Sequence, residues 1–387
     1  MTRYLLRRII SGVVLFFIFI TIVFFAAQLI LPGDYVSQFY GLPLEAKETL
    51  RIQLGLNLPI GQRYLRWLGN LLRGDLGNSY SVRGTGPPVI EIILSVVPPT
   101  LLVFGVGTAL AFLIGTWLGQ QTAWQTIPAI SGSAVLSSIL LYTAFPPWLG
   151  FLLSYLLITR IKLLPGTGVW SADLWFHAPL NRQRIMIWML VTLLIVVALL
   201  VGANALVKRF TRRPIPVTIF VPLAAAAWLA SWYVGGIGPY ALDVMKQALL
   251  PTLAFTLLSF GEIMLIMRSN MIDTLHEDYI TTAVAKGLTR HEVRNRHAAR
   301  NALLPVLSRL VISLPYLLTG VVMIEFTLNW EGLGSTLFYA FGRQNVTLAI
   351  GMTVVVALIS LGARLLLDVI VVLLDPRIRH SARTGSI

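Results

Sequence analysis

Three side chains in this sequence have the types, but not the spacing, of a zinc-dependent hydrolytic site: His291, Glu292 and His297. The zinc-protease pattern places two histidines four residues apart, so that both face the metal from one side of a helix. Here the histidines are six residues apart and face different sides, and the basic neighbours Arg290 and Arg294 disfavour a cation. The chain has no cysteine, which excludes a thiolate site. We therefore expect no metal site.

The sequence also lacks the parts of a nucleotide-hydrolysing site. A phosphate-binding loop of the form Gly-X-X-X-X-Gly-Lys-Ser/Thr is absent, and no nucleophile is placed beside a histidine base. We expect a non-catalytic protein that carries no cofactor of its own.

The composition is typical of a polytopic membrane protein. Apolar residues make up 56% of the chain and charged residues 12%, whereas soluble domains carry roughly 25% charged residues. We expect an all-α membrane protein of about eight transmembrane helices, because lipid requires every backbone polar group to be satisfied within the helix. The predicted spans are 9–31, 98–119, 134–158, 185–207, 215–234, 248–268, 303–325 and 347–373.

The basic residues predict the orientation of these spans. If the N-terminus is cytoplasmic, three clusters of Lys and Arg lie inside, within 208–213, 286–300 and 377–383. This arrangement follows the positive-inside rule, and both termini are then cytoplasmic. The net charge of +14 is thus explained by topology, and we expect no nucleic-acid partner.

Residues 1–387 are expected to form a single transmembrane domain with two notable extramembrane segments. Residues 32–97 would form an external region with short amphipathic helices near 44–55 and 60–73. Residues 269–302 would form the longest charged loop on the inner side.

The inner loop has the pattern of a helix, a break and a second helix. Asp278 to Lys286 contains good helix formers and is followed by Gly287, a residue favoured where a helix ends in a left-handed conformation. Thr289 and Glu292 then have the spacing of a capping box, which predicts a second helix over 290–304.

Two interpretations of this first helix remain open on spacing alone. The small residues Ala283 and Ala285 would make it a compact knob for another protein. Alternatively, the segment is a solvated loop whose arginines hold it to anionic lipid.

The same loop resembles the coupling loop of ABC-importer permeases, in particular those of the dipeptide/oligopeptide family. The resemblance spans almost the whole chain in the family's order. It rests on Thr282-Ala283, Ala285-Lys286-Gly287-Leu288, Arg300-Asn301-Ala302 and Pro305-Val306 in the loop, and elsewhere on Leu31-Pro32-Gly33-Asp34, Gly74-Asp75-Leu76-Gly77, Pro147-Trp148-Leu149-Gly150, Gly332-Leu333-Gly334 and Leu374-Asp375-Pro376-Arg377.

The resemblance implies a type I importer permease that forms half of a translocation pathway for di- or oligopeptides in a bacterial or archaeal cytoplasmic (inner) membrane. It implies a second homologous permease, two ABC ATPases that hold ATP and Mg, and an extracytoplasmic substrate-binding protein as partners. The residues it assigns to ATPase coupling are Asp278, Tyr279, Ala283, Ala285, Lys286, Gly287 and Leu288. Those assigned to support of the coupling helix are Thr289, Glu292, Arg300, Asn301 and Pro305.

Ionisable residues within spans are functional candidates, because they are costly in lipid. Glu262 lies deeper in its span than Arg268 and is our candidate for the pathway. Arg364 and Asp368 are four residues apart and could pair on one helix.

The sequence departs from the family pattern at several points. Thr281-Thr282 replaces Glu-Ala in the loop, and Glu331 replaces the proline before Gly-Leu-Gly. Residues 180–240 would be an inserted helix pair added to a family core of six spans, and an even number preserves the orientation downstream. The alternatives are an importer of another solute, such as nickel chelates or sugars, or an ATP-independent channel or carrier.

Overall fold

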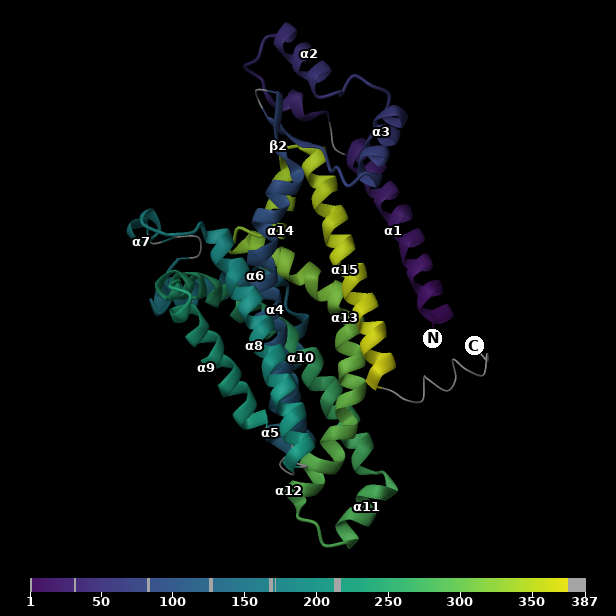
Figure 1. The fold of residues 1–387 in the computed structure, drawn as a ribbon, viewed down its shortest axis with the longest axis vertical. Coiled ribbons are helices and arrows are strands. Elements are labelled where there is room, and N and C mark those ends of the chain that lie inside the picture. The colour runs from purple at the N-terminus through teal and green to yellow at the C-terminus, as the bar shows by residue number, and fades with distance from the viewer. Residues whose placement is uncertain are drawn as a thin grey trace.

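The computed structural model describes residues 2–30, 33–81, 84–124, 128–166, 170, 172–211 and 217–374. Helices dominate this part of the chain and run side by side along the long axis of the molecule (Figure 1). The short elements of residues 35–88 cap one end of the bundle, and α11 and α12 lie at the opposite end (Figure 1). The two predicted extramembrane segments are thus on opposite sides of the predicted spans.

Within the described residues, four helices are long and apolar enough to cross a membrane. They are α1 (Thr2–Ile30), α4 (Val89–Trp124), α8 (Arg182–Thr211) and α10 (Gly238–Leu275). Helices also occupy three further predicted spans, namely α9 (Val217–Val234), α13 (Ala299–Thr327) and α15 (Val346–Leu374). The polytopic all-α prediction is confirmed.

The remaining predicted span, 134–158, is bent. It consists of α5 (Pro128–Thr143), α6 (Pro146–Ser154) and the π-helical turn η2 (Tyr155–Arg160), and the helix axis bends by 106° between residues 143 and 146. Pro146 and Pro147 stand at the bend, where their missing N–H groups cannot continue the first helix. If this pair forms one span, it is a broken one.

A row of small residues brings α4 and α10 into close contact. Gly107, Ala111, Gly115 and Gly119 recur every four residues and therefore share one face of α4. A Cβ atom on Gly115 would lie 2.8 Å from the Phe260 carbonyl oxygen, and one on Gly119 would lie 2.8 Å from that of Met264. Small residues at such positions let membrane helices approach backbone to backbone.

The end of the bundle formed by residues 35–88, which is predicted to be external and is called the outer end below, contains elements that were only partly predicted. The 3-10 turn η1 (Tyr35–Gln38) precedes α2 (Leu44–Gln53) and α3 (Ile60–Leu72), which match the two amphipathic stretches. An unpredicted antiparallel hairpin follows, β1 (Asn78–Ser81) with β2 (Gly84–Pro88). Asn345, just before α15, donates from Nδ2 to Ser79 Oγ at 2.8 Å and ties this hairpin to the bundle.

The short elements α7 (Ala172–Phe176) and α14 (Leu333–Gly342) complete the outer side of the fold. At the opposite end, which is predicted to be cytoplasmic and is called the inner end below, α11 (Asp278–Ala285) is followed by α12 (Arg290–Glu292) and the π-helical turn η3 (Val293–Ala298). These segments lead directly into α13, so the predicted helix over 290–304 is the start of a span.

Candidate functional site

The inner loop folds as its residues predict. Gly287 has a φ of +78°, the left-handed conformation in which a residue without Cβ is least strained. Two residues later the capping box is closed, because Glu292 N donates to Thr289 Oγ1 at 3.3 Å and Thr289 N donates to Glu292 Oε2 at 3.2 Å. Helix α11 is thereby held as a separate short element below the bundle.

One face of α11 is buried against the chain itself. Ile280 and Ala283 are each 5% exposed and belong to a cluster with Met267 and Met271 of α10 and Ala302 of α13. Ala283, which was expected to contact an ATPase, therefore seats α11 on its own spans. The small size of this side chain lets the helix lie close to them.

The opposite face of α11 is open. Asp278, Tyr279, Ala285 and Lys286 are exposed, and Leu288 is half-buried in the apolar cluster. Val284, which the sequence analysis did not single out, is 59% exposed. An exposed valine beside an exposed lysine offers both an apolar and a charged contact to a partner.

Two side-chain hydrogen bonds fasten the loop to the spans. Asn301 of α13 donates from Nδ2 to the Tyr279 hydroxyl at 2.8 Å, which joins two of the predicted residues. Arg294 donates from Nη1 to Gln121 Oε1 near the end of α4 at 3.0 Å. Neither Arg294 nor Gln121 was proposed as a support residue, because nothing in the sequence pairs positions so far apart.

The structure does not give every predicted support residue a contact of that kind. Arg300 and Pro305 are exposed on α13. In the described part of the chain, the Arg300 side chain forms no ion pair or hydrogen bond. Their assigned roles remain predictions.

Glu262, the pathway candidate, is an ion-pair partner within the bundle. Its side chain is 11% exposed, and its Oε1 lies 3.2 Å from Nε of Arg309, whose side chain is 54% exposed. The exposed charge at this level therefore belongs to Arg309 of α13. Arg309 was not predicted as a functional residue, although a lone cation inside an apolar stretch is a signal for one. The side chains of Arg364 and Asp368 lie outside the described residues, so their pairing is untested.

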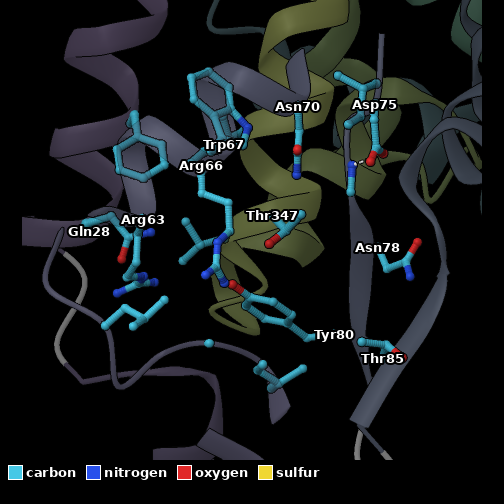
Figure 2. A pocket seen from close by; sticks show the side chains of 18 of the residues that line it. Gln28, Arg63, Arg66, Trp67, Asn70, Asp75, Asn78, Tyr80, Thr85 and Thr347 are labelled. Carbon is cyan, nitrogen blue, oxygen red and sulfur yellow. Dashed lines mark hydrogen bonds between the residues drawn. The ribbon is translucent and has the colours of Figure 1, made fainter. Parts of the chain in front are cut away.

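A second group of polar residues lies at the outer end. A cavity of about 250 Å³ there is lined by the ends of α1 and α2, by α3, by the hairpin and by the start of α15. Figure 2 shows Arg63, Arg66, Trp67 and Asn70 of α3 on its wall, with Tyr80 of the hairpin facing the Arg66 side chain. The cavity is rich in hydrogen-bond donors.

The Gly332-Leu333-Gly334 motif forms the entry to α14. A Cβ atom on Gly334 would lie 2.6 Å from the Val322 carbonyl oxygen of α13, so that position requires glycine. The backbone N–H of Gly334 donates to Glu325 Oε2 at 2.7 Å. The motif is therefore a close packing contact between α13 and α14.

Comparison with known families agrees with this architecture. The family described as "Binding-protein-dependent transport system inner membrane component" matches residues 191–380, and the N-terminal component of the same transport systems matches residues 1–101. The chain belongs to this family. It is therefore a membrane permease subunit of an ABC importer, as the resemblance predicted.

Relatives of this permease cover nearly the whole chain. The dipeptide transport system permease protein DppB of Escherichia coli is 29% identical over 383 residues, which cover 98% of this chain and 99% of DppB. The oligopeptide transport system permease protein AppB of Bacillus subtilis is 26% identical over 382 residues, which cover 98% of this chain and 100% of AppB.

Proposed function

We propose that this permease imports di- or oligopeptides, and that it forms half of the pathway together with a second homologous permease. The printed names of DppB and AppB support this cargo. On the same proposal, two cytoplasmic ABC ATPases supply the energy from ATP and Mg, and an extracytoplasmic binding protein delivers the peptide. Both termini of the chain lie on the ATPase side.

The observation that carries the coupling role is the attachment of α11. This helix has an exposed tip at Ala285 and Lys286, and its other face packs on η3 and is buried, through Ile280 and Ala283, in an apolar cluster that includes residues of α10 and α13. The bonds of Tyr279 with Asn301 and of Arg294 with Gln121 extend the attachment to α4. A partner that moves the tip therefore moves three helices together.

Such an attachment transmits motion only if the helix bundle has two packings that the partner distinguishes. On our proposal, the exposed face of α11 sits in a surface groove of one ATPase. Closure of the ATPase pair around nucleotide displaces α11 as a rigid element, and the spans follow from inward-open to outward-open. The chain supplies position and stiffness, and the ATPases supply the chemistry.

The substitution Gly287→Val tests this role. A β-branched residue strains the left-handed backbone at φ +78°, and the site is otherwise open, with no atom within 4 Å of a Cβ. We expect assembled transporters to keep ATPase activity and lose most peptide uptake, measured with a labelled dipeptide in proteoliposomes. Gly74→Val is the matched control, because Gly74 has a φ of +79° and equal space but lies at the outer end.

Two results would contradict the proposal. Normal uptake by Gly287→Val would remove the coupling role from this loop. Uptake of a nickel chelate or a sugar instead of peptides, by the complete transporter with its own binding protein, would leave the coupling role intact and change the cargo.

A further inference from the structure

Helix α3 lies at the level of the outer end of α1. The Tyr64 hydroxyl is 2.8 Å from Thr21 Oγ1, and Thr21 lies within the apolar span Arg8–Leu29. The Tyr64 and Trp67 rings also contact the Phe24 ring, with centroids 5.3 and 5.2 Å apart. At about 1.5 Å per residue, Thr21 is about 12 Å below the outer end of this span. The inner face of α3 therefore packs at the depth of the outer membrane interface.

The opposite face of α3 carries both exposed leucines and exposed arginines. Leu65 is 68% and Leu72 is 67% exposed, and each stands next to an exposed arginine, Arg66 and Arg73. Leucines and arginines on one face, with a tryptophan at the border, are typical of a helix lying in a lipid interface. The positive-inside rule places arginines on the cytoplasmic side, so it does not explain arginines on the outer side. Their presence there needs a different explanation.

The cavity beside α3 is lined by hydrogen-bond donors that have no acceptor among the described residues. Arg63, Arg66, Asn70 and Asn78 line it, and in the described part of the chain none of these side chains forms a hydrogen bond or an ion pair. The indole Nε1 of Trp67 is buried and has no partner. The buried indole donor is costly to leave unpaired, and the four side chains beside it, of which Arg66 and Asn78 are exposed, are open to a ligand that accepts hydrogen bonds.

The charge of the cavity selects an anion. Asp75 is the one carboxylate among the lining residues, and its Oδ1 accepts the backbone N–H of Gly77 at 2.8 Å. Figure 2 shows Asp75 on the side away from Arg63 and Arg66, which leaves the two guanidinium groups facing the opposite part of the cavity. Guanidinium groups bind phosphate and carboxylate oxygens in a bidentate manner.

We propose that this cavity binds the phosphate of an anionic phospholipid of the outer leaflet, with Arg63 and Arg66 as its ligands. The neighbouring Leu65 and Leu72 then contact the acyl region. The depth of α3, its exposed leucines and the unpaired donors together favour a lipid, because a soluble anion needs no apolar surface beside its site. The lipid joins the outer end of α1 to α3 and α15. Phe24 of α1 and Thr347 of α15 both line the cavity beside α3.

Native mass spectrometry of the purified full-length chain tests this. After delipidation in detergent, phosphatidylglycerol or phosphatidylcholine is added back at equal concentration. We expect the wild type to retain phosphatidylglycerol preferentially, and the double variant Arg63→Gln/Arg66→Gln to lose this retention by about tenfold or more. Arg73→Gln is the control, since Arg73 directly follows the C-terminal end of α3 but does not line the cavity; it should retain lipid as the wild type does.

Several outcomes overturn the proposal, including some that need only the wild type. Equal retention of the two lipids by the wild type removes the phosphate-specific site, whether or not the double variant folds. Equal thermal protection by inorganic phosphate and by phosphatidylglycerol assigns the site to a free anion. If the double variant keeps phosphatidylglycerol but no longer captures the extracytoplasmic binding protein, the arginines serve a protein contact instead.

Discussion

Thr100 of α4 donates a hydrogen bond of 2.6 Å to Oε1 of Glu325 in α13, and neither side chain is accessible to any appreciable extent. The second carboxyl oxygen of Glu325 accepts the N–H of Gly334, and Thr100 Oγ1 accepts the N–H of Leu333 at 2.8 Å. Both backbone groups are at the start of α14, where a helix has unpaired N–H groups. The pair therefore fixes the short helix α14 to two long ones.

Removal of the carboxyl group should loosen α14. Glu325→Ala leaves the Gly334 N–H without its acceptor and leaves the Thr100 hydroxyl only the weaker bond to the Val96 carbonyl oxygen at 3.3 Å. We therefore expect a loss of about 2 kcal/mol or more in the free energy of unfolding. Thermal unfolding followed by tryptophan fluorescence measures this. Glu331→Ala is the control, because the Glu331 side chain is 71% exposed and should contribute less than about 0.5 kcal/mol. Equal stabilities of the two variants would contradict the role of the Glu325 pair.

The glycine row of α4 predicts an effect of a single methyl group. Gly115→Ala places a Cβ 2.8 Å from the Phe260 carbonyl oxygen, so α10 must move away, at a cost of about 1–3 kcal/mol. Gly105 lies on the same helix with open space around it, so Gly105→Ala should be neutral or stabilise by up to about 1 kcal/mol. Unfolding in mixed detergent compares the two. A stable Gly115→Ala variant would show that the close contact of α4 with α10 is absent in solution.

The ion pair of Asp34 with Arg51 predicts a dependence on acid. Burial raises the pKa of Asp34, but hydrogen bonds from Arg51 at 2.7 Å and from Ser37 N at 2.9 Å, with the Arg51 charge, outweigh it and lower that pKa. Because the folded pKa lies below the unfolded value of about 3.9, this stabilisation is complete above that pH. It is lost as the pH falls through the folded pKa.

Hydrogen exchange of residues 34–53 measures this loss. In the wild type, protection should fall below about pH 4, as the carboxyl group is protonated. Arg51→Gln should lower protection already at neutral pH and flatten the acid dependence, whereas Arg73→Gln should leave it unchanged. An identical profile for the wild type and Arg51→Gln would exclude this pair as the cause.

The local features of the inner loop were predictable, because each depends on residues close together in sequence. Gly287 and the capping box of Thr289 with Glu292 are such features, and the structure contains both. The burial of Ala283 was not predictable, for the opposite reason. Whether a small side chain faces a partner or the chain's own spans depends on Met267 and Ala302, which only the folded bundle brings to it.

Contacts between residues far apart in the sequence could not be predicted for the same reason. Glu331 departs from the family pattern, and its isolated position suggested no role. In the structure it forms an ion pair of 3.6 Å with Arg182 at the start of α8, whose guanidinium lies 4.7 Å from the Trp170 ring centroid. The unusual residue thus contacts the segment 180–240, which the sequence analysis predicted to be an insertion. One long-range contact accounts for a departure that no local rule explained.

The pair of Glu262 with Arg309 predicts a rescue between two variants. Arg309→Gln leaves the nearly buried Glu262 carboxylate without its cation, and we expect a loss of about 1–2 kcal/mol, because half of the Arg309 side chain is exposed and water screens the pair. Adding Glu262→Gln should recover about 1 kcal/mol of this loss, since two neutral amides need no counter-ion. Thermal unfolding of the four proteins of the cycle gives the coupling, and Lys246→Gln, an exposed position on α10, is the control. Additive losses would show that the two side chains act independently, and that Arg309 is held at its level in the membrane by something other than Glu262.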